Sequence, residues 1–160
     1  MRILLGSEID ELVARAQTSP RRRAHFNVHA DAADPVQRFF VAAQRDSYFR
    51  PHRHAVKSEM ALVLRGRFDV LMFDDTGVLN ARDSAGQGSS GIGWEVPVLT
   101  WHTLLPLEDG SVFLEVKAGP YDAATASESA PWAPAESDAA AAAFLERLRT
   151  LRPGERVTAG

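Results

Sequence analysis

The segment HRHAVKSEMALVLRG, residues 52–66, carries the most informative pattern of this chain. In an extended strand, residues two apart project to the same side, so His52 and His54 are neighbours on one face. Glu59 opens an apolar run that predicts the next strand, which can return its carboxylate to that face. His102 adds a third imidazole far downstream. Three imidazoles and one carboxylate are a ligand set for a divalent transition metal with open positions, so the sequence predicts one Fe(II), Mn, Ni, Co or Zn ion.

An alternative interpretation needs no metal. Two histidines separated by one residue are common on exposed edge strands, so His52 and His54 could be surface residues and His102 a packed core histidine. A glutamate five residues after His54, and a glycine seven residues after that glutamate, favour the metal site instead.

Composition limits the classes of protein that this chain can belong to. Its 160 residues fit one domain with a substantial core. A net charge of −3, with Arg21–Arg23 as a short basic run, gives no reason to expect binding to nucleic acid or to an anionic membrane. The absence of cysteine excludes disulfides, thiolate metal sites and cysteine nucleophiles. The first residues are not apolar enough for a signal peptide, and no window reaches the roughly 18 apolar residues of a membrane span, so we expect a cytoplasmic protein.

The middle of the chain, from about residue 25 to 119, has a sequence pattern typical of a β protein. Short apolar runs separated by turn residues predict an all-β sandwich or small barrel. The sequence DDTG predicts a turn that joins Phe68–Phe73 and Val78–Arg82 into a hairpin. Residues 83–93, rich in Gly and Ser, are expected to form a loop. Residues 112–117 alternate between aliphatic and other side chains, which predicts a strand with two distinct faces.

Two helices are expected to flank the β region. Residues 7–17 carry apolar side chains at helical spacing, with Ser7 as the N-cap. Residues 138–151 combine an alanine run with an apolar stripe, which must pack against the barrel or a partner subunit. The expected organisation is a helix and arm over 1–24, a barrel over 25–121, and an irregular segment, helix and tail over 122–160.

Two motifs resemble those of the cupins. The pattern HxHx4Ex6G of residues 52–66 is similar to the first cupin motif, and Gx5Px4H of residues 91–102 is similar to the second. The resemblance implies a double-stranded β-barrel (jelly roll) with the ion inside its mouth. Three positions depart from the usual motifs: Asp46, Leu99 and Pro106. None is a ligand, but Leu99 replaces the usual glycine and puts the turn geometry there in question.

Further segments extend the likeness over about residues 20–137. They are RRAHFNVH (22–29), DPVQR (34–38), SY (47–48), PHRH (51–54), FDDTG (73–77), VP (96–97), TWHT (100–103), EVKAGPY (115–121) and APWAPAE (130–136). Together they resemble the WbuC family of cupin-fold metalloproteins, which occur among bacterial O-antigen and surface-polysaccharide genes. The resemblance implies a role in lipopolysaccharide biosynthesis. Ser58 departs from the family, where a bulky aromatic usually precedes the ligand glutamate, and is expected to widen the mouth.

Polar residues around the ion should determine the substrate. Lys117 is expected to hold an anionic group and Tyr48 to act as a general acid, with Glu115 beside them. The alternative is that Glu115 and Lys117 form a solvent-facing pair worth little. Residues expected to contact substrate are Arg22, His29, Arg38, Tyr121 and Trp132.

Three functions remain open at this point. The first is metal-assisted isomerisation or proton transfer on a sugar or nucleotide sugar of surface-polysaccharide synthesis. The second is an Fe(II) dioxygenase acting on a small chelating substrate, and the third is a non-catalytic, metal-dependent module that binds small molecules. The apolar stripe of the C-terminal helix and the cupin likeness also predict a homodimer.

Overall fold

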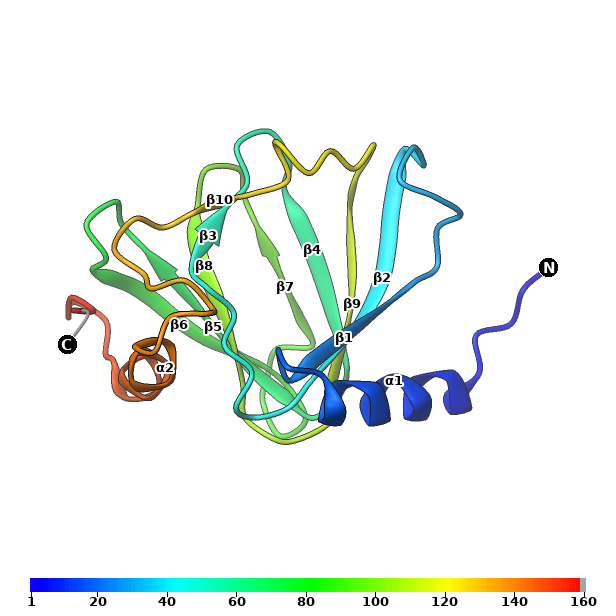
Figure 1. The fold of residues 1–160 in the computed structure, drawn as a ribbon, viewed down its shortest axis with the longest axis horizontal. Helices are drawn as coiled ribbons and strands as arrows, with labels where there is room; N and C mark the ends of the chain where they lie inside the picture. Colours follow the sequence, from blue (N-terminus) through cyan, green and yellow to red (C-terminus); the bar gives the residue numbers. More distant parts are fainter. Residues whose placement is uncertain (159–160) are drawn as a thin grey trace.

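The computed structural model describes residues 1–158 and is mainly β, with two short helices (Figure 1). In chain order its elements are α1 (Gly6–Thr18), β1 (Arg23–Asn27), β2 (Val36–Ala43), β3 (His52–Arg53), β4 (Glu59–Arg65), β5 (Arg67–Phe73), β6 (Leu79–Gly86), β7 (Gly93–Val96), β8 (Trp101–Pro106), β9 (Ser111–Ala118), β10 (Glu128–Ser129) and α2 (Ala141–Thr150). The predicted all-β class with one helix near each end is confirmed. No helix within residues 1–158 combines the length and apolar character needed to span a membrane.

Two five-stranded antiparallel sheets form the barrel. One has the order β1-β2-β9-β4-β7 and the other β10-β3-β8-β5-β6. The predicted hairpin is present as β5 and β6, but β6 continues to Gly86. Residues 83–86, expected to be loop, instead pair with β5, for example Asp83 opposite Val70. Cross-strand pairing overrides the local Gly/Ser composition there.

Strand alternation separates the inside of the barrel from its outside. Along β4, Glu59 and Ala61 are buried, whereas Met60, Leu62 and Leu64 are exposed. The inward side chains of several strands meet in an apolar cluster between the sheets. Its buried members are Val41, Ala43, Ala61, Phe68, Val70, Leu104 and Phe113. This period of two directs alternate positions of a strand into the barrel interior.

Each helix covers the outer face of one sheet. Ile9 and Leu12 of α1 pack on Phe40 of β2. Phe144 and Leu148 of α2 pack on the other sheet, so the chain's own barrel buries the stripe that was also considered for a partner subunit. The predicted homodimer therefore loses that argument and remains a prediction.

The helix ends differ from the predicted ones in detail. The N-cap of α1 is Leu5 rather than Ser7, because Glu8 reaches back to accept the Leu5 backbone N–H at 2.8 Å. At α2, the Asp138 carboxylate accepts the Ala140 N–H at 2.9 Å within a preceding turn. The helix itself begins at Ala141, later than the predicted residue 138.

Candidate metal centre

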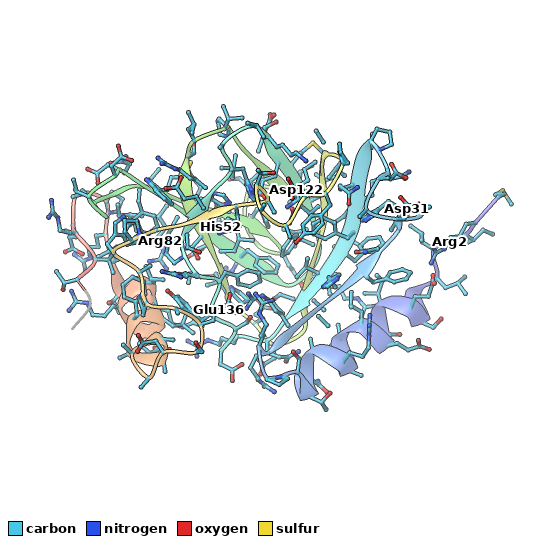
Figure 2. All side chains as sticks on the ribbon, turned by 45° about the horizontal axis from the view of Figure 1, so that its top comes forward. Arg2, Asp31, His52, Arg82, Asp122 and Glu136 are labelled. Atoms are coloured by element: carbon cyan, nitrogen blue, oxygen red, sulfur yellow. The ribbon has the colours of Figure 1, made fainter. Side chains whose placement is uncertain are left out.

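Three strands and the loop after β3 bring together the four predicted ligands. His52 of β3 lies opposite His102 of β8, and the ring centroids are 4.4 Å apart. His54 follows β3, with its ring 5.0 Å from that of His52. Glu59 is the first residue of β4 in the facing sheet. In Figure 2, His52 lies near the middle of the molecule, away from both helices.

The four side chains fit a single divalent ion. One potential ligand atom from each lies within 4.8 Å of the others. The Glu59 carboxylate oxygens are 2.9 Å from Nε2 of His54 and 3.0 Å from Nε2 of His102. Two ligand atoms bound at about 2.1 Å and at a right angle to one another lie roughly 3 Å apart, so these separations match a shared ion.

Backbone carbonyls orient all three rings, a point on which the sequence was silent. Nδ1 of His52 lies 3.0 Å from the Arg50 carbonyl oxygen, and Nδ1 of His102 lies 2.9 Å from that of Thr100. Nδ1 of His54 similarly meets the Ala126 carbonyl oxygen at 2.5 Å. An Nδ1–H donated to a carbonyl leaves Nε2 with the lone pair that a metal needs.

Burial and the charges of neighbouring ligands shift the pKa values of the candidate ligands. Burial, with a smaller contribution from His102, lowers the pKa of His52 to about 3, so its imidazole is neutral at pH 7. Burial opposes ionisation of Glu59, but hydrogen bonds from His102 and His54 outweigh it and hold the pKa of that carboxyl well below its usual value. His52 therefore offers a neutral nitrogen and Glu59 an anionic oxygen, which are the forms that bind a cation. At His102 burial is outweighed by the hydrogen bond and charge of Glu59, which raise its pKa, so a cation would displace a proton there.

The turn before β8 keeps its geometry without the usual glycine. Leu99 adopts φ of +61°, in the left-handed region that glycine favours. Its N–H donates to the His54 carbonyl at 2.8 Å, which ties this turn to a ligand. The leucine side chain is exposed, so only backbone strain opposes the substitution.

A cavity of about 470 Å³ opens beside the ligands. His52 and Glu59 line it together with aromatic side chains such as Phe39, Phe49 and Phe113. Its other polar lining residues include His25, Asn27, His29, Gln37, Glu115, Lys117 and Tyr121. This size and mixture of surfaces are typical of a site for a small polar molecule.

Glu115 and Lys117 point into this cavity from β9, which overturns the solvent-facing alternative. Lys117 Nζ lies 2.6 Å from Glu115 Oε1, and both side chains are largely buried. Lys117 is also the register partner of Glu59 on β4. Burial, reinforced by the charge of Glu59, raises the pKa of Glu115 to about 7.

Among the other predicted residues, His29 and Tyr121 line the cavity, whereas Tyr48 and Trp132 do not. The Tyr48 hydroxyl donates to the Pro134 carbonyl at 3.1 Å, and its ring packs on Phe144. Burial raises its pKa, so this phenol holds its proton within the core. Trp132 packs on the core cluster beneath α2 and so covers apolar surface. The structure thus corrects the predicted roles of both residues.

The two predicted arginines face away from the cavity. Arg38 alternates with the inward Gln37 and Phe39 on β2, and its guanidinium pairs with Asp34 at 2.9 Å. Arg22 precedes β1 with φ of +55° and pairs with Asp46 at 2.9 Å. A shift of one residue along a strand exchanges its faces, which is why Arg38 misses the cavity. Arg22 misses it because it lies in the turn before β1 and its guanidinium turns toward Asp46.

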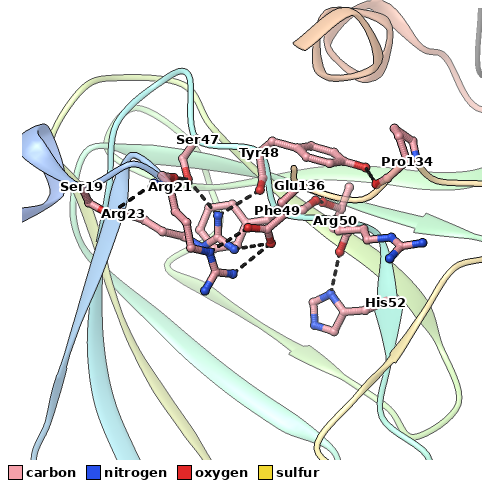
Figure 3. Close-up of polar contacts among 11 residues, drawn as sticks. Ser19, Arg21, Arg23, Ser47, Tyr48, Phe49, Arg50, His52, Pro134 and Glu136 are labelled. Carbon is pink, nitrogen blue, oxygen red and sulfur yellow. Dashed lines mark hydrogen bonds and ion pairs between the residues drawn. The ribbon is translucent and has the colours of Figure 1, made fainter. Parts of the chain in front are cut away.

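Arg21 and Arg23, which flank Arg22 in the basic run, line the cavity instead (Figure 3). Glu136 joins them: its carboxylate accepts from Arg21 Nε at 2.7 Å and from Arg23 Nη2 at 2.5 Å. The Arg23 guanidinium also lies 4.5 Å from the centre of the Phe49 ring. We name Arg21, Arg23 and Glu136 the arginine cluster; its signal in the sequence was the basic run itself.

Replacing Glu136 with glutamine is expected to weaken the fold in a pH-dependent way. Burial opposes ionisation of Glu136, but hydrogen bonds and charge from Arg21 and Arg23 lower its pKa. A carboxyl with a lowered folded pKa stabilises the fold above its unfolded pKa of about 4.5, and this contribution disappears as pH falls through the folded value. Because these groups are partly exposed, we expect a loss of about 1 kcal/mol at pH 7.

Urea unfolding at pH 7 and at pH 3 would measure this difference. The matched control is Glu146→Gln, which breaks the exposed pair with Arg149 at 3.1 Å and should cost at most about 0.5 kcal/mol. An equal loss for Glu136→Gln at both pH values would contradict an ionic origin.

Several solved structures share this fold. KdgF from Halomonas sp. is 19% identical, with a TM-score of 0.50 over 66% of this chain and 85% of that one. Protein SO0799 from Shewanella oneidensis is 11% identical, with a TM-score of 0.57 over 75% of this chain and 82% of that one. Oxalate decarboxylase from Bacillus subtilis is 20% identical, with a TM-score of 0.52 over 84% of this chain but 36% of that one. At these identities the likeness concerns the fold alone, and the predicted cupin barrel is confirmed.

Sequence comparison gives a family without an activity. No curated protein matches this chain. A family model described as "Domain of unknown function (DUF6016)" matches residues 5–84, which are 80 of the 160 residues and include three of the four candidate ligands. The chain, a cupin barrel with a group of three histidines and one glutamate suited to a metal ion, therefore belongs to the DUF6016 family.

Proposed function

We propose that this protein binds one divalent transition metal through His52, His54, Glu59 and His102 and uses it on a sugar or nucleotide sugar. The observation that carries the proposal is the convergence of four ligand atoms within 4.8 Å, three of them on rings already oriented by backbone carbonyls. When bound, such an ion is a Lewis acid that polarises a carbonyl or stabilises an enediolate.

The residues beside the ligands support proton transfer as the reaction. Glu115 has a pKa of about 7, so it can accept or release a proton near neutral pH. Lys117 is 2.6 Å from it and stabilises its ionised form. Asn27, Gln37 and Tyr121 offer hydrogen-bonding groups suited to a polyhydroxylated ligand. These features favour isomerisation or a related proton transfer over the dioxygenase alternative, which rests on the ligand set alone.

The biological setting rests on sequence resemblance. The segments similar to WbuC proteins suggest a bacterial O-antigen or surface-polysaccharide pathway, and therefore a nucleotide-sugar intermediate as substrate. A cytoplasmic location and a homodimer belong to the same proposal. Light scattering at micromolar concentration tests the dimer, and a monomer there would refute it.

Glu115→Gln is expected to lower turnover of the sugar substrate by about 10² to 10⁴ while leaving metal affinity unchanged. The amide keeps the size of the side chain but cannot exchange a proton near neutral pH. Turnover of a panel of nucleotide sugars, followed by chromatography with metal-loaded wild type and variant, makes the comparison. Glu108→Gln, an acidic residue in the connection between β8 and β9, is the matched control.

Two outcomes would overturn the assignment. Oxygen consumption by the Fe(II)-loaded protein with a small chelating acid would favour the dioxygenase. Metal binding by the wild type without turnover of any sugar in the panel would favour a non-catalytic binding module.

A further inference from the structure

Arg21 and Arg23 lie where the cavity beside the four candidate metal ligands meets a second cavity. The neighbouring cavity has a volume of about 350 Å³. Both cavities are lined by Arg21, Arg23, Phe49 and His52. A ligand that reaches the metal ligand His52 can therefore extend toward the two guanidinium groups without leaving the cavities.

The arginine cluster is built to hold an oxyanion. Arg21 donates from Nε at 2.7 Å and from Nη2 at 2.9 Å to the two oxygens of Glu136, the paired geometry that guanidinium adopts with carboxylate or phosphate. Arg23 is 11% exposed and fixed, since its Nη1 donates to the Tyr48 carbonyl at 2.9 Å and its guanidinium lies over the Phe49 ring. Figure 3 shows both guanidinium groups turned toward the same carboxylate.

Charge also favours an incoming anion at this end. Lys117, the residue first expected to hold one, is already paired with Glu115 at 2.6 Å. The second cavity is lined by three arginines, Arg21, Arg23 and Arg50, and a single carboxylate, Glu136. This positive excess attracts anions, and low dielectric around the half-buried groups strengthens the attraction.

We propose that Arg21 and Arg23 form an oxyanion subsite for the carboxylate or phosphate of a ligand whose other end reaches the metal. Glu136 holds the two guanidinium groups in position, and the ligand's oxyanion replaces it. The inference rests on the proposed function, because it takes the ion at His52 as the second anchor. It narrows the substrate class to molecules that carry an acidic group beside the reacting part, such as a sugar acid or a sugar phosphate.

The test titrates inorganic phosphate and, separately, acetate into the full chain, with and without bound Mn(II), by calorimetry. Glu136→Gln removes the internal competitor and should tighten anion binding about tenfold, whereas Arg21→Gln should weaken it about tenfold. Arg21 is 62% exposed, so its replacement leaves the core intact. The matched control is Arg65→Gln, which removes an arginine from the exposed pair with Asp10 and should bind as wild type does.

The outcomes separate the two proposals. Stronger effects with phosphate identify a phosphorylated ligand, and stronger effects with acetate a carboxylate; either supports the subsite. Wild-type anion affinity in both Glu136→Gln and Arg21→Gln would overturn it, and if Glu136→Gln fails to fold, Arg21→Gln decides alone. Failure of the wild type to bind Mn(II) defeats the metal proposal, while the metal-free titrations still judge the arginine cluster.

Discussion

Glu59→Gln is expected to lower the affinity for a divalent metal by about 100-fold. Four ligands share a binding free energy of roughly 10–16 kcal/mol in small structural sites, so one contributes about 3 kcal/mol, and tenfold in affinity is about 1.4 kcal/mol. Glutamine has nearly the same shape, and Glu59 is buried between His54 and His102, so the variant removes the charge with little repacking. Calorimetric titration with Mn(II) or Zn(II), joined to elemental analysis of purified protein, measures the loss.

The matched control for this variant lies one strand away. Glu95 of β7 is exposed and sits opposite Met60, on the outer side of the same sheet. Glu95→Gln should therefore bind metal as the wild type does. Equal stoichiometry and affinity in the Glu59 variant would mean that these side chains do not share an ion.

Phe68→Ala is expected to destabilise the fold by about 4 kcal/mol. Phe68 is fully buried between the sheets, with its ring 5.2 Å from Phe113 and 5.8 Å from Trp94. Removal of the ring leaves a cavity that paired strands on both sides prevent from closing, and it also ends both aromatic contacts. Chemical unfolding of the metal-free protein gives the free energy directly.

Met60→Ala provides the comparison for this loss. Met60 is 44% exposed on the outer face of β4, so truncating it should cost about 0.5 kcal/mol. A similar cost for the two variants would show that the interior of the barrel does not dominate stability.

Most of the fold was predictable because the strands alternate strongly. The period of two along residues 112–117 correctly placed Glu115 and Lys117 on one face, and DDTG correctly ended a hairpin strand at Phe73. The Gly/Ser composition wrongly predicted a loop at residues 83–86, because the strand there depends on pairing with β5, which composition does not report. Local composition also failed at the ends of both helices, where the choice of cap depends on single side chains such as Glu8.

The sequence predicted the site residues only where the spacing between them determines how their side chains lie relative to one another. His52, His54, Glu59 and His102 converge as their spacing indicated. Within the basic run, however, nothing in the sequence distinguishes Arg22 from Arg21 and Arg23. Arg21 and Arg22 lie in the turn before β1, where no strand period assigns a face, and the positive φ of Arg22 has no local signal. The roles of Tyr48 and Trp132 were wrong because the Tyr48 ring packs on Phe144 of α2 and Trp132 packs on the same core cluster, and neither packing has a local signal.

The carbonyl partners of the three imidazoles have a consequence for the evolution of this barrel. Because peptide oxygens of Arg50, Thr100 and Ala126 set each ring tautomer, the side chains at positions 100 and 126 have no part in orienting the ligands. Those positions can drift freely so long as the main chain keeps its course. The candidate metal centre is thereby insulated from substitution around it, and new pocket walls can arise in descendants without rebuilding the group of four ligands.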